Sequence, residues 1–320
     1  MNLDLKDRKL LYWLDQSSRM TNKELGKKIR LTEQAVGHRM NKLEKTGVIR
    51  KYITFVNTLA LGYSHYKVLV RFQNVSPAKE KEILDYLITH PKIRWVVSCS
   101  GHWDVNFSIM AISPIEFQET YRTIENNYGN YIAEKSISIL VNSPGFSKGH
   151  LIGEKSIKIN HYCSTEKIEI DELDIRIIKS ISQSSRKTSV ELARELKTTS
   201  DVVRYRIKKM ERSGVISGYT LQIGLSKLGL TRASVYLSLH NVTLEIEKKM
   251  IGFAQMHNNI IFYLSLIGTY DAALEFEIPS QNVLDETIKK FRELFTNHIK
   301  NFEVIYYTDE LKYDFFPFAV

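Results

Sequence analysis

At 320 residues, the chain has room for about two to four ordinary domains. Hydrophobic residues make up 43% of it and charged residues 25%, as in soluble globular proteins, and no apolar run approaches the roughly 18 residues that cross a membrane. By itself, the net charge of +9 indicates little more than solubility. The charged N-terminal segment predicts that there is no signal peptide, and we expect Cys99 and Cys163 to be free thiols in a reducing cytoplasm.

The positive charge is concentrated in two segments. Residues 1–52 hold 13 Lys and Arg against 6 Asp and Glu, and residues 167–219 hold 12 against 8, so the rest of the chain is close to neutral. Such a local excess of positive charge is expected where a protein binds a polyanion.

The first basic segment predicts three short helices and a strand. Apolar residues at helical spacing mark the first helix, and a capping box between Thr21 and Glu24 begins the second. Thr32 caps the third helix and Gly47 ends it. A strand is predicted next, over residues 48–56. Three helices with a tight turn before the third, followed by a strand, predict a winged helix-turn-helix.

Beyond this segment, strands and helices alternate. Strands are predicted at 65–72, 93–100, 104–111 and 133–141, with helices at 77–89 and 114–128. This β-α-β-β-α-β order is that of a ferredoxin-like domain.

The second half of the chain repeats the first at a constant offset. Gln16-Ser17-Ser18-Arg19 recurs as Gln183-Ser184-Ser185-Arg186, and Gly47-Val48-Ile49 recurs as Gly214-Val215-Ile216. In the second copy, the third helix is predicted to bury Val202, Val203, Ile207 and Met210. Strands are predicted there at 232–239, 260–266, 270–277 and 302–308, with helices at 244–257 and 281–297. The chain therefore carries two linked copies of one unit.

The predicted fold class is α+β, with two repeats. The predicted domains are winged helix-turn-helix 1 at 1–60, β-α-β-β-α-β domain 1 at 61–142, a linker at 143–167, winged helix-turn-helix 2 at 168–226, β-α-β-β-α-β domain 2 at 227–310 and a C-terminal tail at 311–320. The tail is rich in aromatic residues, so we expect it to pack against the body of the protein or a partner chain.

The third helix of a helix-turn-helix enters the major groove of DNA. In the first copy, the predicted DNA-binding residues of this helix and the following strand are Thr32, Glu33, Gln34, His38, Arg39, Asn41, Lys42, Arg50 and Lys51. In the second copy they are Ser200, Arg204, Tyr205, Arg206 and Lys208. Gln and Asn can pair with adenine edges, whereas Lys and His reach guanine or phosphate. Because the two faces differ at almost every position, the two copies are expected to prefer different DNA sequences.

Three positions of these helices allow two interpretations each. Arg39 and Arg206, which match across the copies, either contact phosphate or brace the wing. Gly37 is unusual inside a helix, where glycine costs about 1 kcal/mol relative to alanine. A close approach to DNA explains it, and so does drift.

Several motifs of the first copy occur in a specific order: Leu5-x-Asp7-x-x-x-Leu11, Arg19-x-Thr21-x-x-Glu24-Leu25 and Arg39-x-x-x-Leu43-Glu44-x-x-Gly47-Val48-Ile49-x-x-Tyr52. Residues 173–219 match this order again. Together they resemble the N-terminal part of the Lrp/AsnC transcription regulators, and each β-α-β-β-α-β domain resembles that family's regulatory RAM domain. The usual protomer of the family has one such unit, whereas this chain has two.

The resemblance implies a cytoplasmic regulator of transcription that binds double-stranded DNA, with no cofactor and no membrane partner. It implies a small-molecule effector, often an amino acid, near the glycine–aspartate turns, which are Gly101 with Asp104 and Gly268 with Asp271. The alternative is that these residues only form turns. It also implies a homo-oligomer through the RAM sheets, either as an internal pseudo-dimer or as a longer assembly. Trp103 and Tyr270 would then either line a pocket or pack in the interface. Packing in the interface is the favoured interpretation.

Two other functions compete with DNA-binding regulation. Siroheme decarboxylases have a similar fold and also occur as tandem fusions, but they act through a histidine with arginine or tyrosine around the second strand. Neither copy has a matched histidine with a nearby arginine, and His102 and His257 are isolated, so we do not expect an enzyme. The third function is an interaction protein in which one helix-turn-helix no longer binds DNA, since Asp201 lies near the start of the second recognition helix.

Overall fold

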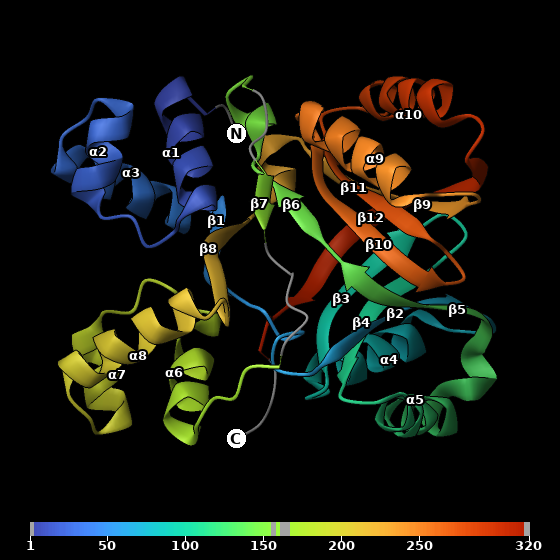
Figure 1. Ribbon diagram of the computed structural model, residues 1–320, viewed down its shortest axis with the longest axis horizontal. Helices are drawn as coiled ribbons and strands as arrows, with labels where there is room; N and C mark the ends of the chain where they lie inside the picture. Colours follow the sequence, from blue (N-terminus) through green and yellow to red (C-terminus); the bar gives the residue numbers. More distant parts are fainter. Residues whose placement is uncertain (1–2, 155–157, 161–166, 317–320) are drawn as a thin grey trace.

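The computed structural model describes residues 3–154, 158–160 and 167–316, so Cys163 and the tail residues 317–320 lie outside the described residues. Two small helical units lie on one side of the molecule and a large sheet with four covering helices on the other (Figure 1). A narrow two-stranded sheet lies between these parts. No helix in the described ranges combines the length and apolar character needed to cross a membrane.

Each helical unit consists of three helices and one strand. The first winged unit comprises α1 (Leu5–Gln16), α2 (Asn22–Ile29), α3 (Glu33–Lys45) and β1 (Ile49–Val56), and the second comprises α6 (Glu172–Ser182), α7 (Ser189–Leu196), α8 (Ser200–Arg212) and β8 (Ile216–Ile223). The predicted capping box between Thr21 and Glu24 is present, and Thr32 accepts a hydrogen bond from the backbone N–H of Ala35. Thr188 and Glu191 form the same box in the second unit. These caps satisfy backbone groups that a helix N-terminus leaves unpaired.

Each RAM half has the predicted β-α-β-β-α-β order. The first RAM half comprises β2 (Ser64–Phe72), α4 (Pro77–Thr89), β3 (Ile93–Ser100), β4 (Val105–Ala111), α5 (Pro114–Tyr128) and β5 (Ile132–Asn142). The second comprises β9 (Thr231–Leu239), α9 (Leu244–Met256), β10 (Ile260–Gly268), β11 (Ala272–Ile278), α10 (Gln281–Phe295) and β12 (Ile299–Tyr313). The two helices of each half pack on the outer face of its own strands.

The two RAM halves join into one closed sheet. β12 pairs with β3, and β5 pairs with β10, so the order β10-β11-β9-β12-β3-β4-β2-β5 returns to β10. The inside of this ring is filled by large side chains from both halves, including Trp95, Trp103, Tyr236, Tyr270 and Tyr307. The interpretation that Trp103 and Tyr270 pack in an interface is therefore confirmed, and the interface is internal to the chain.

The RAM pairing that the resemblance implies takes place within the chain. The edge strands of each half-sheet, β3 and β5 in the first and β12 and β10 in the second, already pair with each other. In this arrangement residues 138–142 of β5 pair with β10 and residues 95–100 of β3 pair with β12, so each half covers edges of the other within one chain. The structure thus forms the internal pseudo-dimer.

The sheet also extends beyond two predicted boundaries. β6 (Pro144–Phe146) pairs with β10, and β7 (Lys158–Asn160) pairs with β6, so part of the segment predicted as a linker belongs to the sheet. β12 continues to Tyr313, inside the segment predicted as the tail. After Tyr313, Phe315 and Phe316 are buried among side chains of the second winged unit and β1. The expectation that the tail packs on the body is confirmed for these two residues.

The strands of the two wings pair with each other, and each strand packs partly into the core of the other winged unit. β1 and β8 form an antiparallel pair from Ile49↔Ile223 to Val56↔Ile216. Leu221 and Ile223 of β8 pack into the core of the first winged unit. Ile53, Phe55 and Val56 of β1 pack into the core of the second. Each wing therefore belongs to both cores, which fixes the orientation of one winged unit against the other.

Candidate nucleic-acid interface

The third helix of the first winged unit, α3, exposes the face predicted for DNA. Val36, Met40 and Leu43 are buried against the rest of the unit. The predicted contact residues that this arrangement leaves exposed on α3 and its cap are Thr32, Glu33, Gln34, His38, Asn41 and Lys42. A stripe of buried residues along one side thus turns the polar side chains outward, as in other amphipathic helices.

The third helix of the second unit, α8, has the same geometry with different chemistry. Arg204, Tyr205 and Lys208 are exposed, and the Arg204 guanidinium pairs with the carboxylate of Asp201 one turn earlier. Ser200 is half-buried at the first position of the helix. Val202 was predicted in the buried stripe but is 37% exposed, because Val203, Ile207 and Met210 already complete that stripe.

Arg39 and Arg206 have the same intrachain role in their respective units. Arg39 Nη1 lies 2.6 Å from Asp7 Oδ1 and 2.7 Å from Asp4 Oδ2, which ties α3 to the start of α1. Arg206 forms the same pairs with Asp171 and Asp174. The bracing interpretation is therefore the one that the contacts favour, although the brace is to the first helix and not to the wing.

Arg50 and Lys51 follow each other on β1 and point to different places. Lys51 Nζ lies 3.0 Å from Gln183 Oε1 at the end of α6. Arg50 lines a cavity between the first winged unit and the second RAM half. Both side chains are exposed on the wing strand, and the phosphate contacts expected of them stay a prediction.

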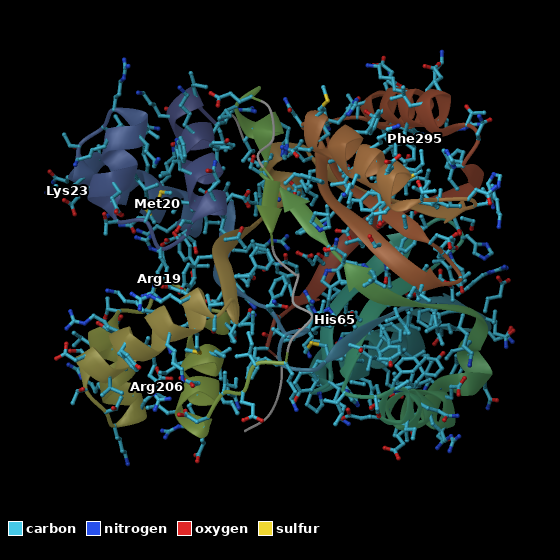
Figure 2. The ribbon with its side chains drawn as sticks, viewed as in Figure 1. Arg19, Met20, Lys23, His65, Arg206 and Phe295 are labelled. Atoms are coloured by element: carbon cyan, nitrogen blue, oxygen red, sulfur yellow. The ribbon has the colours of Figure 1, made fainter. Side chains whose placement is uncertain are left out.

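Basic side chains also cluster at the turn between α2 and α3. Lys23, Lys27 and Arg30 line a shallow, open hollow that ends at Thr32 and Glu33 of α3. Lys23 lies on the outer side of α2, away from the RAM halves (Figure 2). A basic hollow beside a recognition helix is suited to contact a phosphate group.

The repeated Gln-Ser-Ser-Arg motif forms the contact between the two winged units. Ser18 Oγ and Ser185 Oγ are 2.6 Å apart and buried. Ser18 N donates to Tyr219 O at 3.1 Å, and Ser185 N donates to Tyr52 O at 2.9 Å. The same contact thus occurs in both directions, as expected at a two-fold axis.

The arginine of each motif reaches across the same axis. Arg186 Nη1 donates to the backbone oxygens of Ser18 and Met20, at 2.6 and 2.9 Å. Arg186 lies over the ring of Tyr52 and Arg19 over that of Tyr219, which places Arg19 between the two units (Figure 2). The sequence showed this motif only as a repeat. Its constant offset was the signal from which an axial contact could have been predicted.

Gly37 faces these axial contacts. A Cβ atom at Gly37 would lie 3.2 Å from Asn22 Nδ2, and the side-chain oxygen of Asn22 in turn accepts from Arg186 at 3.5 Å. An alanine there would require the Asn22 side chain to shift by only a few tenths of an ångström, so the contact favours neither interpretation of the glycine.

Known proteins share both the winged units and the whole architecture. Residues 3–50 and 170–217 each match a winged helix-turn-helix DNA-binding family. The HTH-type transcriptional regulator LrpB of Bacillus subtilis is 31% identical over 134 residues, which cover 41% of this chain and 86% of that protein. An HTH-type transcriptional regulator of Pyrococcus horikoshii, PH0140, is 32% identical over 126 residues, which cover 39% of this chain and 75% of that protein. The chain belongs to the Lrp/AsnC family of transcription regulators.

This Lrp/AsnC chain also resembles a solved structure over nearly its whole length. The crystal structure of the siroheme decarboxylase NirDL matches it with a TM-score of 0.62, covering 96% of this chain and 92% of that one, at 13% sequence identity. At such a low identity, the likeness concerns the fold alone.

The glycine–aspartate turns of the RAM halves have a structural role. Asp104 Oδ2 accepts from the backbone N–H of Phe72 at 2.6 Å, and Asp271 Oδ2 accepts from that of Leu239, also at 2.6 Å. Gly268 has a φ of +143°, and a Cβ there would lie 2.4 Å from the oxygen of Ile137. Gly101 has a φ of +125°. The contacts therefore favour the turn-forming interpretation over effector binding.

One histidine with a nearby arginine was missed in the sequence. His65 on β2 is buried, and Arg94 Nη1 on β3 lies 2.9 Å from its Nδ1. The matched positions of the second copy hold Arg232 and Ile261, so the pair is not repeated there, as expected. The space beside His65 is only about 60 Å³, and Phe315 lies over the Arg94 guanidinium at 4.3 Å.

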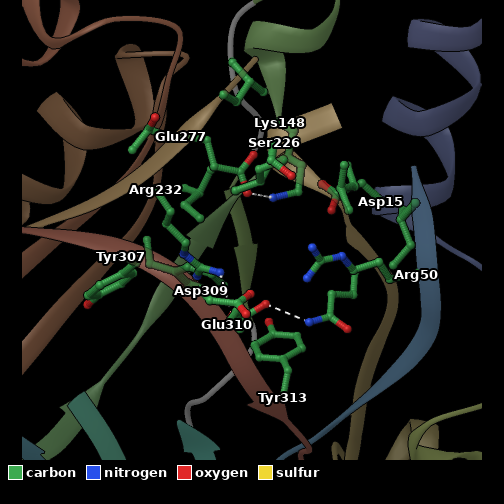
Figure 3. Close-up of a pocket in the computed structure, with 18 of the residues that line it drawn as sticks. Asp15, Arg50, Lys148, Ser226, Arg232, Glu277, Tyr307, Asp309, Glu310 and Tyr313 are labelled. Carbon is green, nitrogen blue, oxygen red and sulfur yellow. Dashed lines mark hydrogen bonds and ion pairs between the residues drawn. The ribbon is translucent and has the colours of Figure 1, made fainter. Parts of the chain in front are cut away.

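The sequence also gave no sign of the cavity that Arg50 lines. This cavity of about 500 Å³ lies between the first winged unit, β8 and the second RAM half (Figure 3). Its charged lining residues include Asp15, Arg50, Lys148, Arg232, Glu277 and Glu310. They come from distant parts of the chain, so only the tertiary structure brings them together. We call it the wing cavity.

Proposed function

We propose that this chain is a cytoplasmic, sequence-specific DNA-binding regulator of transcription that presents two unlike recognition helices, α3 and α8, from one polypeptide. The observation that supports this most is the axial contact between Ser18 and Ser185, which joins the two winged units as the subunits of a dimer would be joined. The family of the chain, whose relatives are HTH-type transcriptional regulators, supports the same function.

The two helices divide the recognition of one DNA site. Gln34 and Asn41 are exposed on α3, and an amide side chain can pair with an adenine edge in the major groove. Arg204 and Lys208 are exposed on α8, where they suit guanine acceptors. Lys23 and Lys27 add phosphate contacts that fix the register without reading sequence. A single chain should therefore recognise a site with two unlike halves.

The test is selection of bound sequences from random duplex DNA, followed by the affinity of the selected site for two double variants. Gln34→Ala with Asn41→Ala should weaken binding about 10- to 1000-fold and relax sequence preference in one half-site only. Arg204→Ala with Lys208→Ala should do the same in the other half-site. Lys81→Ala, which removes an exposed lysine of α4, is the matched control and should change the affinity little.

A palindromic selected site, bound by two chains, would contradict recognition by unlike helices. If the α8 variant alone had no effect on affinity or on its salt dependence, the second winged unit would be a scaffold. The absence of any enriched sequence and of any salt-dependent binding would overturn the proposal as a whole.

A tetrapyrrole enzyme is the second candidate, because the fold resembles NirDL and because His65 and Arg94 lie together. The small space beside His65 and the ring of Phe315 oppose it, since a tetrapyrrole would have to displace the tail. Incubation with iron-uroporphyrin III and measurement of the visible absorption of the desalted protein decides between the two. We expect no retained colour, and stoichiometric retention would favour the enzyme.

A further inference from the structure

The wing cavity is lined by the winged and RAM parts of the chain together. Asp15 comes from α1, Arg50 from β1, Arg232 from β9 and Glu310 from β12, and all four surround the same open space (Figure 3). Its volume of about 500 Å³ is within the range of sites for small molecules.

Three carboxylates of the cavity already have partners. Glu310 accepts from Gln222 at 2.8 Å and from Arg232 at 3.0 Å. Glu277 pairs with Lys148, and this neighbouring charge holds the pKa of the Glu277 carboxyl well below its usual range. Asp15 accepts from Thr220 at 2.9 Å, and burial raises the pKa of its carboxyl. Charges satisfied in this way have little left to offer a ligand.

Arg50 differs from these three paired carboxylates. Its guanidinium points into the open space (Figure 3), and it makes no hydrogen bond or ion pair with the described residues. The aromatic rings of Phe55, Phe262 and Tyr313 form a wall of the same cavity. A guanidinium without an anionic partner, beside an apolar wall, is a site for a carboxylate on an apolar body.

The repeat relates the wing cavity to a site beside Arg94 in the first RAM half, and that site is closed. Lys148, which lines the wing cavity, matches Phe315 at the constant offset of the repeat. Phe315 is buried, with its ring 4.5 Å from that of Phe55 and 4.3 Å from the Arg94 guanidinium. The ring of Phe315 therefore fills the site beside Arg94. Lys148 pairs with Glu277 instead, and the wing cavity stays open.

We propose that the wing cavity binds a small organic carboxylate, with the carboxylate on Arg50 and an apolar body against Phe55, Phe262 and Tyr313. Asp309, an exposed residue of the lining, would add a contact to an ammonium group if the ligand is an amino acid. A simple organic acid and an amino acid share the carboxylate, and this is the group that Arg50 would bind. If the proposed DNA-binding function holds, a ligand here contacts α1 and β1 together with β9 and β12 and so links the RAM half to the orientation of the first winged unit.

The test is calorimetric titration of the full chain, without DNA, with phenylacetate, phenylalanine and 2-phenylethylamine. Phenylacetate should bind, and 2-phenylethylamine, which has the same body and the opposite charge, should not. Arg50→Gln should weaken phenylacetate binding by about tenfold or more, as expected for loss of a bidentate charge-assisted pair. Lys51→Gln is the matched control on the same strand and should leave ligand binding within about twofold.

A second variant guards against an indirect effect of Arg50→Gln. Ser226→Trp enters the cavity from its exposed rim and should abolish binding without altering the thermal unfolding of the chain. Tighter binding of phenylalanine than of phenylacetate would identify the ligand as an amino acid and support the site. Equal binding to wild type and Arg50→Gln, preferential binding of the amine, or no binding of either carboxylate at about 5 mM would overturn it. A chain that binds phenylacetate but no DNA would overturn the proposed function and support the cavity.

Discussion

Ser18 and Ser185 place their hydroxyl oxygens 2.6 Å apart, and they are the same residue of the repeat, 167 positions apart in the chain. A residue that meets its own counterpart lies on a two-fold axis. The axis runs between the two winged units, and the exchanged wings β1 and β8 pair across it. The chain therefore contains within itself the kind of contact that would otherwise form between two protomers.

Removal of the axial hydrogen bond should destabilise the whole chain. Ser185→Val buries extra methyl groups against Ser18 and leaves that hydroxyl without its partner, so the free energy of unfolding should fall by about 1–3 kcal/mol. Ser184→Val, at an exposed neighbouring position, should change it by less than about 0.5 kcal/mol. Urea unfolding of both variants measures the difference, and equal effects would show that the axial pair contributes nothing.

Arg39 should matter for stability and Lys42 for DNA. Arg39→Met leaves the buried carboxylate of Asp7 without its cation, and we expect a loss of about 1–3 kcal/mol in the free energy of unfolding. Lys42→Met, on the exposed face of the same helix, should be nearly neutral for stability and should weaken DNA binding. Denaturant unfolding and a DNA titration separate the two roles. If Arg39→Met weakened DNA binding and left stability unchanged, Arg39 would be a DNA contact.

Burial and the charges of Arg94 and Lys67 hold the pKa of His65 well below its ordinary value of 6.5. Since the unfolded chain then binds a proton before the folded chain does, stability is fully present above pH 6.5 and is lost as the pH falls below it. The slope contributed by this residue approaches about 1.4 kcal/mol per pH unit. His65→Gln should remove that slope between about pH 5 and 6.5, whereas exposed His102→Gln should retain it. Parallel pH curves for wild type and His65→Gln would contradict this assignment.

Phe315 should anchor the C-terminal strand to the second winged unit. Its ring packs against Phe55 and Arg94 and is 2% exposed, so Phe315→Ala should lower the free energy of unfolding by about 3–5 kcal/mol. Tyr205→Ala removes an aromatic ring that is 67% exposed and should have little effect on stability. Thermal and urea unfolding provide the comparison. A small loss for Phe315→Ala would mean that the tail rests on the surface without stabilising it.

The order and type of the elements could be predicted because they depend on local chemistry. The capping box of Thr21 and Glu24 fixes a helix start wherever the helix lies, and the stripe of Val36, Met40 and Leu43 fixes which face is buried. Val202 shows the limit of such reasoning. Two adjacent valines of α8 suit the stripe equally well in sequence, and only the packing selects Val203.

The sequence by itself determined the duplication, the α+β class, the family resemblance and the outward faces of α3 and α8, because repeats, caps and periodicity are written in neighbouring residues. The tertiary structure alone decided that β12 joins β3 and β5 joins β10, since an edge strand has the same pattern whether its partner lies in its own chain or in another. It also decided that Arg39 braces α1, that Arg50 faces a cavity and that Ser18 meets Ser185. These contacts join residues far apart in the chain, and no local pattern specifies which distant side chain a residue will meet.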